Sequence, residues 1–264
     1  MKIVMSIAGS DSSAGAGIQA DLKTISAHGM YATTVVTAVT AQNTLGVQGV
    51  MPVSHELLQQ QLVSILSDLP PSAVKIGMLK DAESVCIAAD CLHSFHAPHI
   101  VLDPVMLSSG GQRLMDKDAC VAMQEVLFPM CELITPNRME AEALIGIRIQ
   151  NKQDMESAAK RLYEQFGCAV LCKGGHIGGD PDDLLCNENG LTWICGKRID
   201  NPDSHGTGCT LSSAIACRLA QGHDLITSVT MAKEYLSGAL QAGLHIGAGS
   251  GPMQHFFSGS SSSL

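Results

Sequence analysis

The sequence predicts an α/β protein of three layers, in which helices cover both faces of a mostly parallel β-sheet. Short apolar runs alternate along the chain with longer segments whose apolar residues recur at helical spacing. This alternation is typical of parallel sheets that are covered on both faces. Polar residues directly follow several of the apolar runs, as they do where parallel strands end at a ligand site. No linker-like stretch divides the chain, so we expect a single domain over residues 1–257 and a loose Gly/Ser-rich tail over 258–264.

The first part of the chain contains closely spaced strands and helices. A strand is expected over residues 2–8, a helix over 17–28, and a strand rich in Val and Thr over 31–40. An apolar stripe at helical spacing, formed by Leu58, Leu62, Ile65 and Leu66, then predicts a helix. That helix should end before Pro70, because proline lacks the backbone N–H that a helix needs. A short strand over 73–76 and a helix over 81–95 follow.

The second part repeats these units and adds a hairpin. Strands are expected over 99–102, 131–134 and 168–172. The tripeptide TPN at 135–137 opens one helix, and a second helix carries its apolar residues on one face, namely Met155, Ala158, Ala159, Leu162 and Phe166. Residues 183–186 and 191–195, joined by the turn NENG, predict a β-hairpin. Two helices, from about 206 to 221 and from about 225 to 244, complete the chain.

Composition narrows the possible functions. Of the 264 residues, 45% are hydrophobic and 16% are charged, which excludes a globally disordered chain. The formal net charge of -9 argues against a broad nucleic-acid-binding surface. The N-terminal apolar run ends at Asp11, so no signal peptide is expected, and the uncharged stretch 24–55 is too rich in polar residues to span a membrane. We therefore expect a cytoplasmic protein without nucleic-acid or membrane partners.

The cysteines and histidines do not form recognisable ligand patterns. Ten cysteines are present without a C-x-x-C pair, and several, such as Cys168 and Cys172, lie inside apolar runs. This placement is typical of reduced, buried thiols, so neither a disulfide framework nor a zinc site is expected. His93, His96 and His99 straddle a helix-to-strand loop and are not expected to bind a metal.

A loop of small residues, GSDSSAGAG at 9–17, separates the first strand from the first helix. Gly15-x-Gly17-x-x-Ala20 nominally fits a dinucleotide-binding fingerprint. The glycines lie too far after the strand for that fingerprint, so we interpret the loop as a place where backbone approaches a ligand closely. The alternative is a flexible surface loop.

A second glycine-rich run, HGTGCTL at 205–211, opens an apolar helix. Backbone N–H groups and the positive end of the helix dipole at such a position bind anions and can stabilise charge on a transferred phosphoryl group. Cys209 falls in the first turn, where the same field is expected to lower the pKa of its thiol. The alternative is a glycine-rich helix start with a buried cysteine.

Polar residues at predicted strand ends form a third candidate group. They are Gln42, Asp103, Asn137, Glu140 and Lys173. Because open parallel sheets bind ligands at the carboxyl ends of their strands, these side chains should converge. Asn137 and Glu140 are three residues apart on one helical face, which suits them to orient magnesium or its waters. Each residue taken alone also fits an ordinary cap or loop position.

Seven segments together resemble the hydroxymethylpyrimidine/phosphomethylpyrimidine kinases of thiamine biosynthesis, a family within the ribokinase-like superfamily. They are IAGSDSSAGAGIQADLKT, TAVTAQNTLGVQGV, KIGML, LDPVM, LITPNRMEAEAL, LCKGGH and HGTGCTLSSAIA. The resemblance covers about residues 3 to 257. It implies a ribokinase-like three-layer fold, ATP, Mg²⁺ and a small pyrimidine substrate. It also implies phosphoryl transfer to an exocyclic hydroxymethyl group and then to the resulting monophosphate.

The resemblance also implies roles for individual residues of the pyrimidine pocket. Gln42 resembles the family glutamine that hydrogen-bonds the aminopyrimidine, and an amide offers the donor and acceptor that this ring needs. Met78 looks like a residue lining the same pocket. Asp21 and the loop that begins at Gly9 resemble the other wall of that pocket.

At the phosphate end, Lys173 and Asn137 are expected to serve ATP, and Glu140 and Asp103 the magnesium ion. The run Gly206–Gly208, with Thr207 at its centre, matches the family's anion hole. Cys209 stands where most sugar kinases of the superfamily have aspartate, so it is a candidate base.

Two other functions fit the same residues. Pyridoxal kinase has the same fold and a similar heteroaromatic hydroxymethyl substrate, so pyridoxal kinase or dual activity is the nearest alternative. A non-catalytic pyrimidine-binding protein is a weaker alternative, because binding alone does not require an intact anion hole together with Asn137, Glu140 and Lys173. A homodimer is expected.

Overall fold

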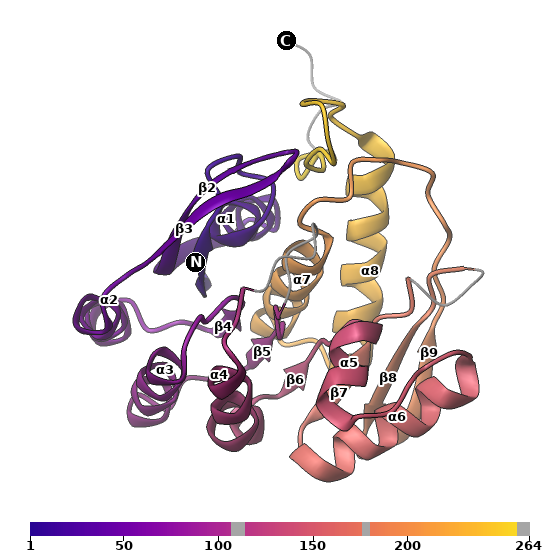
Figure 1. Cartoon of the computed structure of the whole chain (residues 1–264), viewed down its shortest axis with the longest axis horizontal. Coiled ribbons are helices and arrows are strands. Elements are labelled where there is room, and N and C mark those ends of the chain that lie inside the picture. Colours follow the sequence, from indigo (N-terminus) through magenta and orange to yellow (C-terminus); the bar gives the residue numbers. More distant parts are fainter. Residues whose placement is uncertain (107–113, 176–179, 258–264) are drawn as a thin grey trace.

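A central sheet organises the computed structural model, which describes residues 1–106, 114–175 and 180–257. Within these residues the strands form one sheet in the order β3-β2-β1-β4-β5-β6-β7-β8-β9 (Figure 1). The tail expected over 258–264 lies outside the described residues.

Six neighbouring strands run parallel and form the middle of the sheet. They are β1 (Ile3–Ser10), β2 (Tyr31–Asn43), β4 (Ala73–Ile76), β5 (Ile100–Leu102), β6 (Leu133–Ile134) and β7 (Ala169–Cys172). Antiparallel strands flank them, with β3 (Gly46–Pro52) at one edge and the hairpin of β8 (Asp183–Asn187) and β9 (Gly190–Ile194) at the other. The expected mostly parallel sheet and the expected hairpin are both confirmed.

Helices cover the two faces of this sheet, which confirms the three-layer α/β prediction (Figure 1). One face packs against α1 (Gly17–Ala27), α7 (Thr207–Gln221) and α8 (Leu225–Ala242). The other face packs against α2 (His55–Asp68), α3 (Ala82–Ser94), α4 (Lys117–Ala122), α5 (Arg138–Ile145) and α6 (Lys152–Phe166).

The central strands are apolar in nearly every position because both of their faces are buried. Successive side chains of a strand point to opposite faces of a sheet. Accordingly, Val4 packs with the α1–α7–α8 layer and Met5 with the α2–α6 layer, and Leu133 and Ile134 divide in the same way. This arrangement explains why the strands appear in the sequence as continuous apolar runs.

Helix boundaries follow from local chemistry. The Asp81 carboxylate accepts a hydrogen bond from the Ser84 backbone N–H at 2.8 Å and caps α3. Gly146 and Gly167 end α5 and α6 in the left-handed conformation, with φ of 70° and 69°. α2 ends at Asp68, before Pro70, as the sequence predicts.

Two features differ from the sequence-based expectation. β2 continues past Thr40 to Asn43 and pairs with β3, which was not expected because Gly46, Gly49 and Pro52 are all poor strand formers. As an edge strand, β3 tolerates them. α4 and the π- and 3₁₀-helical turns that follow it, Met123–Leu127 and Phe128–Met130, were also not expected. The extension of β2 places Gln42 within a strand, opposite Val47.

The C-terminal segment packs against the start of α7 and the turn between β2 and β3. The His205 backbone N–H donates to the Gly251 carbonyl at 3.2 Å, and the Gly249 N–H donates to Thr44 Oγ1 at 3.2 Å. The segment therefore joins the start of α7 to the turn between β2 and β3. Among the described residues, no helix combines the length and the apolar content that crossing a membrane requires.

Candidate active site

A cavity of about 960 Å³ lies where the carboxyl ends of the parallel strands meet the N-terminus of α7. It is lined by all of the site residues predicted from the sequence except Asp21, that is by Gly9, Gln42, Met78, Asp103, Asn137, Glu140, Lys173, Gly206, Thr207, Gly208 and Cys209. These residues come from segments that are far apart in the sequence, and the parallel sheet brings them to one edge.

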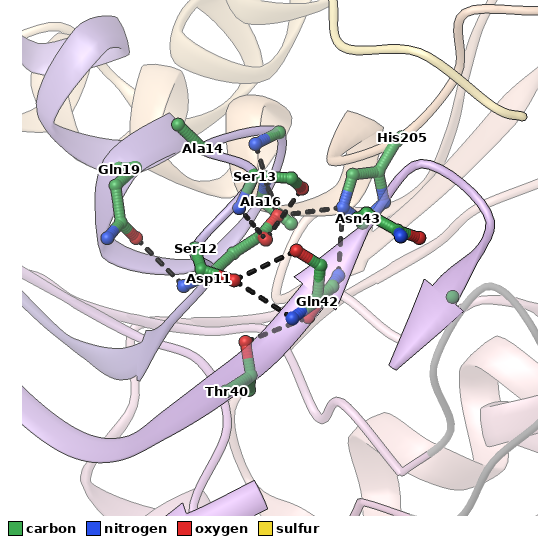
Figure 2. Close-up of polar contacts among 12 residues, drawn as sticks. Asp11, Ser12, Ser13, Ala14, Ala16, Gln19, Thr40, Gln42, Asn43 and His205 are labelled. Atoms are coloured by element: carbon green, nitrogen blue, oxygen red, sulfur yellow. Dashed lines mark hydrogen bonds and ion pairs between the residues drawn. The ribbon is translucent and has the colours of Figure 1, made fainter. Parts of the chain in front are cut away.

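Asp11 organises the small-residue loop that forms one side of this cavity (Figure 2). Its Oδ1 accepts from the Ser13 N–H at 2.8 Å and the Ser13 hydroxyl at 2.7 Å, and its Oδ2 accepts from the backbone N–H groups of Gly15 and Ala16 at 3.1 and 2.9 Å. Burial opposes ionisation of Asp11, but hydrogen bonds from His205, Ser13 and Ala16 outweigh it and lower its pKa to about 2. The loop is therefore built around a buried carboxylate and is not a loose surface loop.

The glycines of this loop allow close contact with the start of α7. A Cβ at Gly15 would lie 2.3 Å from His205 Cδ2, and a Cβ at Gly206 would lie 1.9 Å from the Gly15 carbonyl oxygen. Gly206 also has φ of 85°, a conformation that glycine adopts without strain. The two glycine-rich runs noted in the sequence thus pack directly against each other.

The end of the cavity near β1 and β2 holds the residues expected to bind the pyrimidine. Thr40 Oγ1 lies 3.1 Å from Gln42 Oε1, and Gln42 Nε2 lies 3.1 Å from His205 Nε2. Met78 is almost fully buried, and its Sδ lies 3.3 Å from the position of a Cβ on Gly9. Gln42, Met78 and Gly9 therefore all line this cavity, and the Met78 sulfur lies close to the Gly9 backbone.

Asp21 does not form a wall of this pocket, contrary to the expectation from the sequence. Its side chain is fully buried beneath the cavity, where Oδ2 lies 2.9 Å from Lys75 Nζ. Ser6 Oγ and Ser213 Oγ donate to the same carboxylate at 2.5 and 2.8 Å. Asp21 is therefore occupied in neutralising the buried Lys75, and it does not face the cavity.

The phosphate end of the cavity combines the anion hole with a lysine. Gly206 is the N-cap of α7, and Thr207 and Gly208 are its first residues. A Cβ on Gly208 would lie 2.8 Å from Asp103 Oδ2 and 3.4 Å from Lys173 Nζ. Lys173 Nζ is 2.7 Å from Asp103 Oδ1. The start of α7 and the ammonium of Lys173 therefore lie close together, and a helix start beside a cation suits a phosphate group.

The charge of Lys173 is stabilised by its neighbours. Burial opposes the charge, but the carboxylates of Asp103 and Glu140 outweigh it and raise the pKa of Lys173 above its usual value. Lys173 also pairs with Asn137 in a parallel bridge that continues the pairing of β6 with β7. The lysine is thus a fixed cation at the carboxyl edge of the sheet.

Asn137 and Glu140 form a capping box at the start of α5. Asn137 Oδ1 accepts from the Glu140 N–H at 3.0 Å, and Glu140 Oε2 accepts from the Asn137 N–H at 2.8 Å. Burial raises the pKa of Glu140 to about 7, with the Lys173 ammonium opposing this shift and the Asp103 carboxylate adding to it. Asn137 and Glu140 therefore do cap α5, which is one of the two interpretations that the sequence leaves open.

The carboxylates at this edge suit Mg²⁺ only if substrate phosphates supply the other ligands. In the described ranges, no three His, Cys, Asp or Glu side chains form a cluster that could hold a metal ion by themselves. Mg²⁺ usually keeps several waters and binds through one or two carboxylates together with substrate phosphates. Asp103 and Glu140, both lining the cavity near the anion hole, fit that mode.

Cys209 occupies the first turn of α7, as expected, but its ionisation differs from the expectation. Burial raises the pKa of its thiol; Lys75 and a hydrogen bond from the Gly17 N–H oppose this shift, and Asp21 and Asp103 add to it. The expected lowering of the thiol pKa is therefore wrong. The sequence shows the helix start but not the burial of the thiol or the carboxylates around it.

Several residues of the site were not singled out from the sequence. Asp11 and His205 both line the cavity and stand in the two glycine-rich runs, but neither was given a role of its own. Lys75 lies beneath the cavity, and Ile199, Leu236 and Leu240 form an apolar part of its wall. A single lysine within the apolar run of β4 was an available signal for Lys75, because lysine is rarely buried without a partner. The pairing of Asp11 with His205, 194 residues apart, leaves no local signal.

The chain is similar to known proteins along nearly its whole length. Residues 11–254 match the family model described as phosphomethylpyrimidine kinase. The hydroxymethylpyrimidine/phosphomethylpyrimidine kinase of Streptomyces coelicolor is 43% identical over 96% of this chain and 94% of its own length. The thiamine biosynthesis bifunctional protein ThiED of Geobacter sulfurreducens is also 43% identical, and there the chain spans only 52% of the relative.

Solved structures show the same similarity. The phosphomethylpyrimidine kinase of Clostridium difficile 630 has a TM-score of 0.80 and 39% identity, over 90% of this chain and 98% of that one. A pyridoxal kinase of Staphylococcus aureus, solved with pyridoxal, has a TM-score of 0.91 and 30% identity, over 99% of this chain and 96% of that one. The ribokinase-like fold expected from the sequence is thereby confirmed.

Proposed function

The chain belongs to the phosphomethylpyrimidine kinase family, and from this premise we propose that it is the kinase of 4-amino-5-hydroxymethyl-2-methylpyrimidine and of its monophosphate. It transfers the terminal phosphoryl group of ATP first to the hydroxymethyl oxygen and then to the resulting phosphate, a reaction of thiamine biosynthesis. The observation that carries this proposal is a single cavity, with Gln42 and Met78 at one end and Gly206–Gly208 and Lys173 at the other.

The geometry supports transfer by positioning and by charge stabilisation. Gln42, Met78 and Gly206–Gly208 line one cavity, so we expect a ring held at Gln42 and Met78 to present its hydroxymethyl group toward the start of α7. The backbone N–H groups of Gly206–Gly208 and the ammonium of Lys173 stabilise negative charge on the phosphoryl group during its transfer. Phosphoryl transfer depends mostly on alignment and on such electrostatic stabilisation.

Nucleotide binding follows from the family, and we place ATP in the rest of the cavity. Ile199, Leu236 and Leu240 form an apolar wall suited to a nucleobase. Asn137 and Lys173 line the same cavity at the sheet edge, and we place the phosphates beside them. Mg²⁺ would be held by Asp103 and Glu140 together with those phosphates, and it would screen their charge during the transfer.

Pyridoxal kinase activity is the second candidate. The pyridoxal kinase of S. aureus has a TM-score of 0.91 against this chain, so a fold of this shape holds a pyridine ring with a hydroxymethyl group. Gln42 favours the pyrimidine, because an amide matches an amino group beside a ring nitrogen and pyridoxal lacks that pair.

The proposal is tested by measuring ADP release with the pyrimidine, its monophosphate and pyridoxal side by side. We expect turnover with both pyrimidines and a much lower kcat/KM with pyridoxal. Release of ADP with pyridoxal alone would assign the chain to pyridoxal phosphorylation. Binding of the pyrimidine without any ADP release would favour a non-catalytic pyrimidine-binding protein.

We further propose that residues 1–257 act as one kinase domain and that the protein works as a homodimer in the cytoplasm. The two hydrophobic clusters on either side of one continuous sheet support the single domain. Exposed Leu45 and Met51 on the β2–β3 hairpin are available for a contact between two copies. Light scattering measures the mass in solution, and a monomeric mass contradicts the dimer.

A further inference from the structure

The side chain of Gln42 touches protein groups at both ends of its carboxamide (Figure 2). Its Oε1 lies 3.1 Å from Thr40 Oγ1, and its Nε2 lies 3.1 Å from His205 Nε2. The oxygen and the nitrogen of a carboxamide have nearly the same shape, so the proton positions on its neighbours decide which end carries which atom. The protons of Thr40 and His205 therefore determine what Gln42 offers to a ligand.

Asp11 fixes the proton on His205. Asp11 Oδ2 lies 2.8 Å from His205 Nε2 and also accepts hydrogen bonds from Gly15 and Ala16. With a pKa of about 2, this carboxylate is ionised and has no proton to donate. His205 Nε2 must therefore carry a hydrogen and donate it to Asp11, and it cannot at the same time accept an N–H from Gln42.

Thr40, at the other end, accommodates this orientation. Its single hydroxyl hydrogen faces the Ser10 carbonyl oxygen at 3.0 Å as well as the Gln42 amide at 3.1 Å. A hydroxyl that donates to Ser10 can accept from Gln42, and one that donates to Gln42 leaves Ser10, so Thr40 alone does not fix the amide. With its oxygen toward His205, the carboxamide presents an acceptor to the single Nε2–H, which Asp11 and Gln42 then share, whereas the opposite orientation sets N–H against N–H.

We propose that Asp11 and His205 form a positioning relay that holds the Gln42 carboxamide in this single orientation and thereby selects a ring with an amino group beside a ring nitrogen. The inference deepens the proposed function and rests on it. The hydroxymethyl group must face Gly206–Gly208, which fixes the rotation of the ring. The amide oxygen then meets the amino group, and the amide N–H meets the ring nitrogen.

The packing around His205 is consistent with a positioning role. The side chain is only 11% exposed, and its ring lies against Gly15, where any larger residue would displace it. His205 also directly precedes Gly206, the N-cap of α7. The residue that orients the amide is therefore held by the same backbone that forms the anion hole.

The test compares two ligands that differ only in the order of donor and acceptor. The probes are 4-amino-5-hydroxymethyl-2-methylpyrimidine and its 4-oxo analogue, which carries a carbonyl in place of the amino group and an N–H in place of the ring nitrogen. Against a fixed Gln42, the analogue sets oxygen against oxygen and N–H against N–H. We expect the wild-type protein to bind the amino compound at least about tenfold more tightly in calorimetric titrations.

Variants at position 205 separate orientation from mere packing. In His205→Leu the Gln42 amide is free to turn, because the Thr40 hydroxyl can either donate to it or accept from it. We therefore expect the preference for the amino compound over the 4-oxo analogue to fall to about twofold or less. The affinity for ATP should not change. His205→Gln reaches as far and keeps an N–H for Asp11 and for Gln42, so it should retain the preference. His93→Leu, at an exposed histidine of α3, is the matched control.

The outcomes distinguish the relay from the proposed function. If His205→Leu has a normal thermal transition and still prefers the amino compound as strongly as the wild type does, the relay is wrong. If that variant does not fold, His205→Asn, whose shorter amide cannot reach Gln42, takes its place with the same expected loss. A wild-type protein that binds neither pyrimidine contradicts the proposed function and the relay together.

Discussion

The ammonium of Lys75 lies 2.9 Å from the carboxylate of Asp21, and neither side chain is exposed to solvent. Lys75 lies in β4 and Asp21 in α1, and neither residue lines the cavity. Burial opposes the charge of Lys75, but Asp21, Cys209 and Asp103 outweigh it and raise its pKa. The ion pair is therefore net neutral, and each partner compensates the charge of the other inside the protein.

Removing one member of this pair should strongly destabilise the fold. Asp21→Asn leaves the Lys75 ammonium buried without a counter-charge, which costs about 3–5 kcal/mol of unfolding free energy. Chemical denaturation measures this loss. The double variant Asp21→Asn/Lys75→Met should be more stable than Asp21→Asn alone, because no uncompensated charge remains. Lys152→Met, in the exposed pair with Asp182, should change stability little.

Gln42→Leu should weaken pyrimidine binding and leave ATP binding unchanged. Leucine fills the same space but leaves the polar groups of the ring unpaired in the cavity, which costs about 1–3 kcal/mol. Calorimetric titration of each ligand measures the two affinities separately. Gln48→Leu changes an exposed glutamine on the adjoining β3 strand and is the control. Unchanged pyrimidine affinity in Gln42→Leu would show that Gln42 does not recognise the ring.

Gly15→Ala should impair pyrimidine binding without touching the ligand. The added Cβ would lie 2.3 Å from His205 Cδ2, so the imidazole must move away from Asp11 and Gln42. We expect a higher KM for the pyrimidine, measured by steady-state kinetics, and little change in the KM for ATP. Gly49→Ala is the control, because a Cβ there meets only Ala41 at 3.7 Å. Equal KM values for both variants would contradict this account of Gly15.

Most of the fold could be predicted because apolar periodicity is a local property. β4 begins and ends as expected, and the apolar stripe on α6 is fully buried. β3 could not be predicted, because Gly46, Gly49 and Pro52 oppose a strand and only pairing with β2 stabilises it. Prediction from local pattern fails where a distant segment supplies the stabilising contacts.

The candidate site also has a part that could be predicted from the sequence and a part that could not. Gly206–Gly208 and Lys173 could be placed because strand ends and helix starts are visible in sequence and converge at one edge of a parallel sheet. The relation of Asp11 to His205 could not, because it depends on how two loops pack. The ionisation of Cys209 was wrongly predicted for the same reason, since burial depends on the whole fold.

Glu140→Gln should raise the magnesium concentration needed for half-maximal turnover. The substitution removes a negative charge near Lys173 and Asp103 but keeps an oxygen that can cap α5. A magnesium titration of the initial rate measures the shift, and Glu188→Gln, in the exposed turn between β8 and β9, is the control. An unaltered magnesium requirement would exclude Glu140 from this role.

The same carboxyl group predicts a pH dependence of stability. Burial raises the pKa of folded Glu140 to about 7 from a usual value of 4.5. Its contribution to stability is therefore fully present below pH 4.5 and is lost as the pH rises through 7, by a few kcal/mol in order of magnitude. Unfolding free energies measured across this range should fall less steeply in Glu140→Gln. Parallel curves for the two proteins would contradict the raised pKa.

Cys209 provides the most demanding test of the chemistry. The acceptor hydroxyl must lose its proton as the new P–O bond forms, and a basic group in the first turn of α7 is well placed to take it. We expect Cys209→Ala to fold normally but to lose most of its turnover. Cys209→Asp should retain some turnover, because aspartate is also a proton acceptor of similar reach.

The raised pKa of the Cys209 thiol decides how a pH series should look. Burial keeps the thiol mostly protonated at neutral pH, since its pKa lies above the ordinary value of 9.0. If the thiolate is the base, wild-type turnover at saturating substrate rises with pH through the alkaline range. In Cys209→Asp this rise should disappear, because a carboxyl group ionises in the acid range. If the thiol only packs against the ring, Cys209→Ala raises the KM for the pyrimidine but keeps turnover and its pH profile near those of the wild type. In that case the anion hole and Lys173 carry the catalysis.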